Sequence, residues 1–128
     1  MGFDQYHEPP EELSQETRTL ARIFASLTEE AEAINWYEQR LSVEQDADAR
    51  AIIEDARHEE YKHFSMDLEF LFRRRPEWRA IAEGVLFRPG AITENADAAE
   101  EAAEEGSGAT GGGGDEGSLG IGGLRRKS

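Results

Sequence analysis

Apolar residues recur at alternating steps of three and four along two long stretches of the chain, which predicts two amphipathic helices. We expect the first helix to start at Pro9-Pro10, because proline suits a first turn, and to run to about Leu41. Glu30 fills the one gap in its apolar rhythm. The apolar positions of this rhythm are Leu20, Ile23, Leu27, Ile34, Tyr37 and Leu41.

The second helix is predicted to begin at a cap on Asp46 or Asp48 and to end in the basic run before Pro76. Polar side chains also interrupt its apolar stripe, which consists of Ile53, Ala56, Glu60, His63, Asp67 and Phe70. The short connection between the helices predicts an antiparallel hairpin. Pro76 is expected to open a third, short helix that reaches Val85.

The composition bounds the rest of the chain. We expect an all-α helical domain over residues 1–96, a flexible Ala/Glu/Gly-rich linker over 97–116 and a terminal peptide over 117–128. Gly supplies 10 of the last 23 residues, and there is no Cys. The formal net charge of −14 repels nucleic acids and anionic membranes, and no apolar run is long enough for a membrane span. A soluble cytoplasmic protein is expected.

The polar residues of the second helix include a Glu-x-x-His pair, Glu60 and His63. Because three residues leave a helix only about 60° short of a full turn, both side chains project from one face. Carboxylate and imidazole together suit iron, manganese or zinc, and the spacing selects none of them. A buried ion pair with Arg57 is the alternative interpretation.

Glu30 changes the balance between these interpretations. Di-iron carboxylate bundles use a Glu from each of two helices and a Glu-x-x-His from each of two others, and this chain carries one of each. Two copies related by a twofold axis would complete a four-helix bundle and a two-metal site. Asp67 is expected to orient His63 or to pair with an arginine, and Tyr37 to approach the site or to fill the core; these alternatives stay open.

Glu29, Glu32 and Trp36 share a different face of the first helix. These carboxylates are either simply solvated or form a weak second cation site, and the sequence leaves both interpretations open.

The residues from Ser26 to Arg40, together with Glu60 to His63, resemble encapsulated ferritin. This resemblance implies a ferroxidase that oxidises Fe(II) with O2 at an intersubunit di-iron centre and delivers Fe(III) for mineral storage. By position, Glu30, Glu60 and His63 match its ligands and Tyr37 a neighbouring residue. Glu29 and Glu32 match an outer metal site near Trp36. The expected oligomer is a dimer, several copies of which assemble into an annular decamer.

The terminal peptide is similar to the segment by which cargo proteins dock inside encapsulin nanocompartments. Its apolar residues Leu119, Ile121 and Leu124 are separated by small residues, a pattern that lets an extended peptide place anchors in pockets. An encapsulin shell protein is therefore an expected partner. The competing hypothesis is a non-enzymatic helical interaction module with a structural metal site or a buried polar network.

Overall fold

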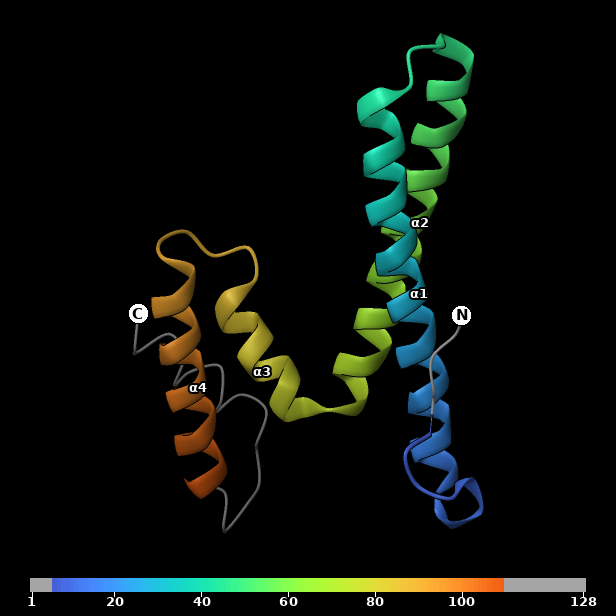
Figure 1. Cartoon of the computed structure of the whole chain (residues 1–128). Helices are drawn as coiled ribbons and strands as arrows, with labels where there is room; N and C mark the ends of the chain where they lie inside the picture. The colour runs from blue at the N-terminus through green and yellow to red at the C-terminus, as the bar shows by residue number, and fades with distance from the viewer. Residues whose placement is uncertain (1–5, 110–128) are drawn as a thin grey trace. The chain divides into compact units, whose positions relative to one another are not determined.

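The computed structural model describes residues 6–109, and this part of the chain contains only helices and their connections, as predicted (Figure 1). The helices are a 3-10 helix at Pro10–Glu12, α1 at Gln15–Val43, α2 at Ala47–Arg74, α3 at Pro76–Val85 and α4 at Ile92–Ala109. The chain divides into two compact units, Met1–Leu71 and Phe72–Ser128, which are described in turn.

The start of α1 differs from the expectation. The prolines open only a single 3-10 turn, after which Leu13 is extended. Ser14 then caps α1, because its hydroxyl accepts a hydrogen bond from the Thr17 amide at 3.0 Å. The helix therefore begins at Gln15, since a capping serine satisfies the free amides of a first turn and a proline does not.

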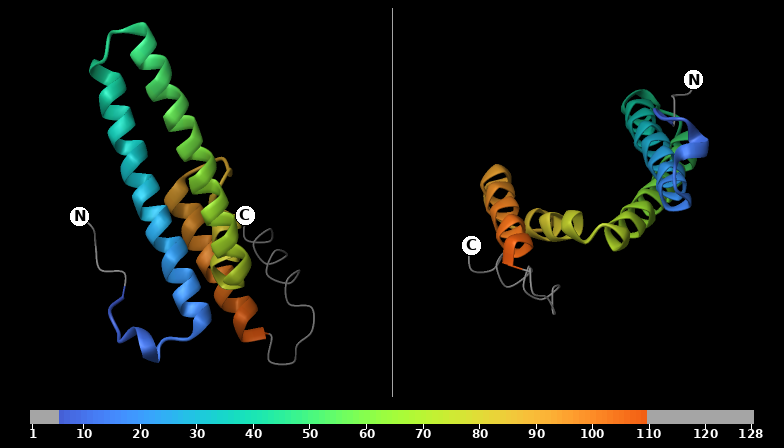
Figure 2. Two further views of the ribbon diagram at one scale, coloured as in Figure 1. Left: turned by 90° about the vertical axis from the view of Figure 1, so that its right-hand side faces the viewer. Right: turned by 90° about the horizontal axis from the view of Figure 1, so that it is seen from below.

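The helices α1 and α2 lie side by side and antiparallel, as Figures 1 and 2 show from different directions. Their connection is only residues 44–46. Asp46 caps α2, because its carboxylate accepts a hydrogen bond from the Ala49 amide at 2.9 Å. Arg50 braces the turn from α2 by donating to the carbonyl oxygen of Glu44 at 3.0 Å.

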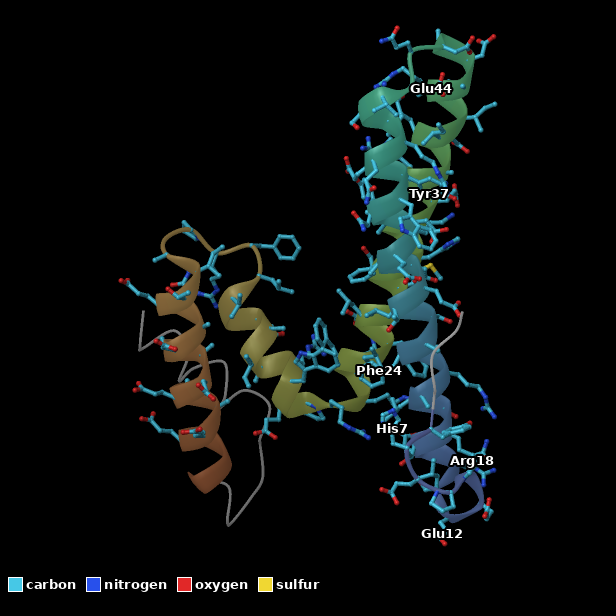
Figure 3. All side chains as sticks on the ribbon, in the orientation of Figure 1. His7, Glu12, Arg18, Phe24, Tyr37 and Glu44 are labelled. Carbon is cyan, nitrogen blue, oxygen red and sulfur yellow. The ribbon has the colours of Figure 1, made fainter. Side chains whose placement is uncertain are left out.

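The hairpin encloses a thin core. Its buried apolar side chains within the described residues are Leu20, Leu41 and Leu71, of which Leu71 is completely buried, whereas several large apolar side chains are substantially exposed. Phe24 is one of them and is labelled on α1 in Figure 3; the others on this unit include Trp36, Ile52, Tyr61 and Met66. A hairpin of this kind needs further apolar contacts for stability, because two helices alone bury little surface.

The second unit is built on α3 and α4. Ala99 and Ala102 of α4 are almost completely buried, and Ile81 and Val85 of α3 pack against them. The expectation of a flexible coil from Asp97 is therefore wrong as far as residue 109. Alanine has the best intrinsic helix propensity, and its small side chain lets two helices approach closely enough to bury it.

None of the helices in residues 6–109 has the length and hydropathy that a membrane span requires. The proposed docking residues Leu119, Ile121 and Leu124 lie outside the described residues.

Candidate metal centre

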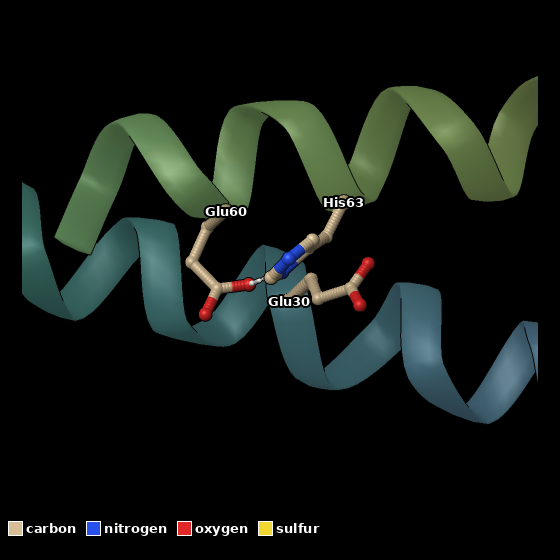
Figure 4. A group of neighbouring side chains, drawn as sticks. All are labelled: Glu30, Glu60 and His63. Atoms are coloured by element: carbon tan, nitrogen blue, oxygen red, sulfur yellow. Dashed lines mark ion pairs between the residues drawn. The ribbon is translucent and has the colours of Figure 1, made fainter. Parts of the chain in front are cut away.

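Glu30, Glu60 and His63 come together on the hairpin. One ligand atom from each side chain lies within 4.8 Å of the others, a spacing at which all three can hold one metal ion. Figure 4 shows Glu30 on α1 and the other two side chains on α2 meeting at the same level of the two helices. The local reason is the antiparallel register, which brings the gap in the apolar rhythm of α1 opposite the Glu-x-x-His of α2.

Within residues 6–109, one oxygen of each carboxylate in this group is buried without a hydrogen bond. Oε1 of Glu30 and Oε1 of Glu60 are inaccessible to solvent and form no hydrogen bond within the described chain. Burial, contact with the Asp67 carboxyl group and the negative charges of Asp67, Glu60 and Glu29 raise the pKa of Glu30 to about 7. The site is therefore an acidic cluster that a cation would stabilise.

Arg57 does not supply that cation. Its guanidinium lies 3.0 Å from Oε2 of Glu38 on α1 and 5.6 Å from the ring centroid of Tyr61. The Tyr61 hydroxyl donates to the same Glu38 oxygen at 3.3 Å. The alternative of a buried ion pair between Arg57 and the core glutamates is thus not the arrangement in the structure.

His63 lies close to two glutamates of its own helix. Its Nδ1 lies 3.6 Å from Oε1 of Glu60, and its Nε2 lies 3.9 Å from Oε1 of Glu59. A hydrogen bond and ion pair with Lys62 lower the pKa of Glu59. Glu59 was missed as a candidate from sequence, although its place one turn before His63 puts it within reach of the ring.

Asp67 also has a different neighbour from the two that were expected. It faces Glu30 across the hairpin, and its Oδ2 is inaccessible and without a hydrogen-bond partner. Neither His63 nor an arginine is hydrogen-bonded to it in the described part of the chain. The sequence marked Asp67 as a polar interruption but did not identify the residue it meets.

The remaining candidates lie outside this group. Tyr37 is on α1 two turns beyond Glu30, towards the connection to α2, and its ring contacts the Arg40 guanidinium at 5.5 Å (Figure 3). Glu29 and Glu32 are exposed, and Trp36 is 48% exposed. Among residues 6–109, no group of three ligating side chains includes either of these glutamates.

A known protein family matches most of this chain. The model of the EncFtn-like family matches residues 5–89, which contain the whole metal group. The chain belongs to the EncFtn-like family.

Relatives of this EncFtn-like chain extend the match. It is 42% identical over 123 residues to an encapsulated ferritin-like protein of Rhodospirillum rubrum, covering 93% of this chain and 86% of the relative. It is 43% identical over 109 residues to a ferritin-like protein of Thermotoga maritima, covering 85% of this chain and 92% of the relative.

A crystal structure of a Nitrosomonas europaea protein superposes on the EncFtn-like chain with a TM-score of 0.67 at 39% identity. The match covers 70% of this chain and 99% of that protein. The helical fold predicted from sequence is therefore one that a related sequence adopts.

Proposed function

We propose that this protein is a ferroxidase, which binds Fe(II) at Glu30, Glu60 and His63 and oxidises it with O2. The observation that carries the proposal is the convergence of these three side chains, with two buried carboxylate oxygens that have no hydrogen-bond partner in the described chain. Membership of the EncFtn-like family supports a ferritin-like role in iron handling. Iron is here the substrate of the reaction and also forms the proposed di-iron centre.

The chain's own residues explain how iron would be held. Glu30 and Glu60 supply anionic oxygens, and His63 supplies a neutral ring nitrogen, a donor set that suits iron. Glu59 lies near the far side of the imidazole ring, 3.9 Å from its Nε2. Each Fe(II) ion loses one electron, and O2 accepts two electrons with two protons to give hydrogen peroxide, or four of each to give water.

The proposed centre is shared between two chains. The described residues of one chain offer a single group of three candidate ligands, and the side chain of His63 in this group is 43% exposed. A second copy related by a twofold axis would add the same three ligands and cover the exposed apolar side chains of the hairpin. Such dimers would be the units of the expected annular decamer. The proposal includes Glu29 and Glu32, near Trp36, as an outer cation site, and Tyr37 as a residue that would approach the catalytic group in the assembled bundle.

The test of the enzymatic proposal is O2 consumption after Fe(II) is added to metal-free protein. We expect oxidation well above the protein-free rate, and loss of this excess in Glu60→Ala and His63→Ala. Asp55→Asn is the matched control, because Asp55 is an exposed acid on another face of α2. Oxidation at the protein-free rate in the unchanged protein would instead favour the structural metal site of the alternative hypothesis.

The proposal also includes delivery of iron inside an encapsulin shell. Its support is the relative named as encapsulated ferritin-like, together with the pattern of Leu119, Ile121 and Leu124. We expect deletion after Glu116 to abolish loading into a co-expressed encapsulin shell and to leave Fe(II) oxidation intact. Loading at the level of the full chain would refute the docking role.

A further inference from the structure

Asp67 is an acidic side chain of α2 that faces Glu30 of α1 and is not matched by a cation. Its Oδ2 is inaccessible to solvent and has no hydrogen-bond partner in the described chain. The cation expected near this cluster, Arg57, pairs with Glu38 instead. Asp67 therefore adds a carboxylate beside the metal group, and within residues 6–109 its described neighbour is the carboxyl group of Glu30 rather than a cation.

The position of Asp67 makes a packing role a poor explanation. It follows His63 by one helical turn and so lies on the stripe that is otherwise apolar on α2. An apolar side chain there would face Glu30 without adding repulsion, whereas a carboxylate adds both a desolvation cost and repulsion between like charges. In the metal-free protein a proton on Glu30, whose pKa is raised to about 7, offsets part of this cost, and a bound cation would take the place of that proton.

The charge count changes with Asp67. Glu30 and Glu60 together balance a divalent ion when His63 is neutral, and Asp67 raises the negative charge of each chain's group to that of a trivalent ion. We infer that Asp67 is a specificity-determining residue, which shifts the selectivity of the metal group from divalent towards trivalent ions. This inference rests on the proposed function only for the identity of the ion, since Fe(III) is the product of the proposed oxidation.

The size of the effect follows from Coulomb's law. The interaction of a fixed charge with an ion is proportional to the charge of the ion, whatever the distance and the dielectric constant. The logarithm of the affinity lost on neutralising Asp67 should therefore be about 1.5 times larger for a trivalent than for a divalent ion. A tenfold loss for the divalent ion, for example, predicts a loss of about thirtyfold for the trivalent ion.

The experiment measures binding of Mn(II) and Tb(III) to the full-length metal-free protein, Mn(II) by calorimetry and Tb(III) by its luminescence. Both ions prefer oxygen ligands and keep their oxidation state during the titration. We expect Asp67→Asn to weaken Tb(III) binding by a larger factor than Mn(II) binding, and Asp67→Glu to restore most of the selectivity. The exposed-acid control Asp55→Asn should change neither ratio.

Equal losses for the two ions in Asp67→Asn would overturn the inference, because general damage to the site weakens both ions alike. Should the asparagine variant lose helicity, Asp67→Ser removes the same charge with a smaller side chain and is judged by the same ratio. The outcome is independent of the oxidation assay. A shifted ratio in a protein that fails to oxidise Fe(II) would refute the proposed function alone, and an unshifted ratio in an active protein would refute the role of Asp67 alone.

Discussion

Replacing Glu30 by glutamine should stabilise the metal-free protein at alkaline pH. The structure raises the pKa of this carboxyl group from 4.5 to about 7, mainly by burial and by its contact with Asp67. The folded state then binds more protons than the unfolded state between these two values, so stability falls as the pH rises. Ionised Glu30 is a cost that the metal-free hairpin carries at physiological pH.

The magnitude follows from the same shift. A difference of about 2.5 pKa units corresponds to at most about 3 kcal/mol of stability lost once the pH is above 7. About 2.5 kcal/mol of this loss falls between roughly pH 5 and pH 8. The rest of the loss occurs mainly below about pH 5, where this carboxyl group already ionises in the unfolded state. Glu30→Gln keeps the shape of the side chain and removes the titration, so its stability advantage should grow across that interval.

The assay is urea unfolding of the full-length protein in the presence of a chelator, followed by helical circular dichroism at a series of pH values. The quantity to compare is the free energy of unfolding of the variant minus that of the unchanged protein. Asp55→Asn removes one exposed acid from α2 and controls for the change in net charge. If the curves of Glu30→Gln and the unchanged protein run parallel from acid to alkaline pH, Glu30 does not titrate as described.

Three further predictions concern the site and the fold. Affinity for a divalent ion should fall as the pH drops below the raised pKa of Glu30, because protons then compete with the metal for this carboxylate. Protonation of Glu30 should lower the affinity by up to about tenfold per pH unit, which calorimetry with Mn(II) would detect. An affinity that stays constant down to about pH 5 would contradict this prediction. Arg57→Ala should cost about 1 kcal/mol in urea unfolding by removing the ion pair with Glu38, yet leave metal affinity within about twofold, because Arg57 does not pair with the ligands. Ala102→Leu should overpack the contact with Ile81 and lower stability by about 1 to 3 kcal/mol, as thermal unfolding would show.

The hairpin could be predicted because its signals are local. Leu20 and Leu41 lie on the predicted stripe and are buried, and the Asp46 cap and short connection determine where α2 starts. The start of α1 was placed too early, because a proline pair permits a first turn but does not require the helix to continue. The prediction of a coil in place of α4 rested on composition, because alanines such as Ala99 and Ala102 offer little apolar area to bury. These small side chains nevertheless pack closely against α3.

The sequence identified the three side chains that come together as the candidate metal group, and their role as ligands stays a prediction. Helical spacing places Glu60 and His63 on one face, and the gap in the apolar rhythm of α1 identifies Glu30. Spacing along one helix does not predict which side chain of the facing helix a residue contacts. The pairing of Arg57 with Glu38 was therefore not predicted. The contact of Asp67 with Glu30 depends on the same register between helices and was missed for the same reason.

The acidic group also explains why assembly and metal binding should be linked in this chain. Without a cation, each hairpin carries buried oxygens of Glu30, Glu60 and Asp67 that lack hydrogen-bond partners. Bringing two such acidic groups together increases the repulsion between their carboxylates. The apolar contacts of the proposed dimer stabilise it, and this repulsion at the metal-free site cancels part of that stabilisation. A bound ion removes that opposing contribution, and its binding free energy is then shared with association. Glu30→Gln should for this reason associate more readily than the unchanged protein when metal is absent, and sedimentation in a chelator would measure the difference; tighter association of the unchanged protein would contradict the reasoning.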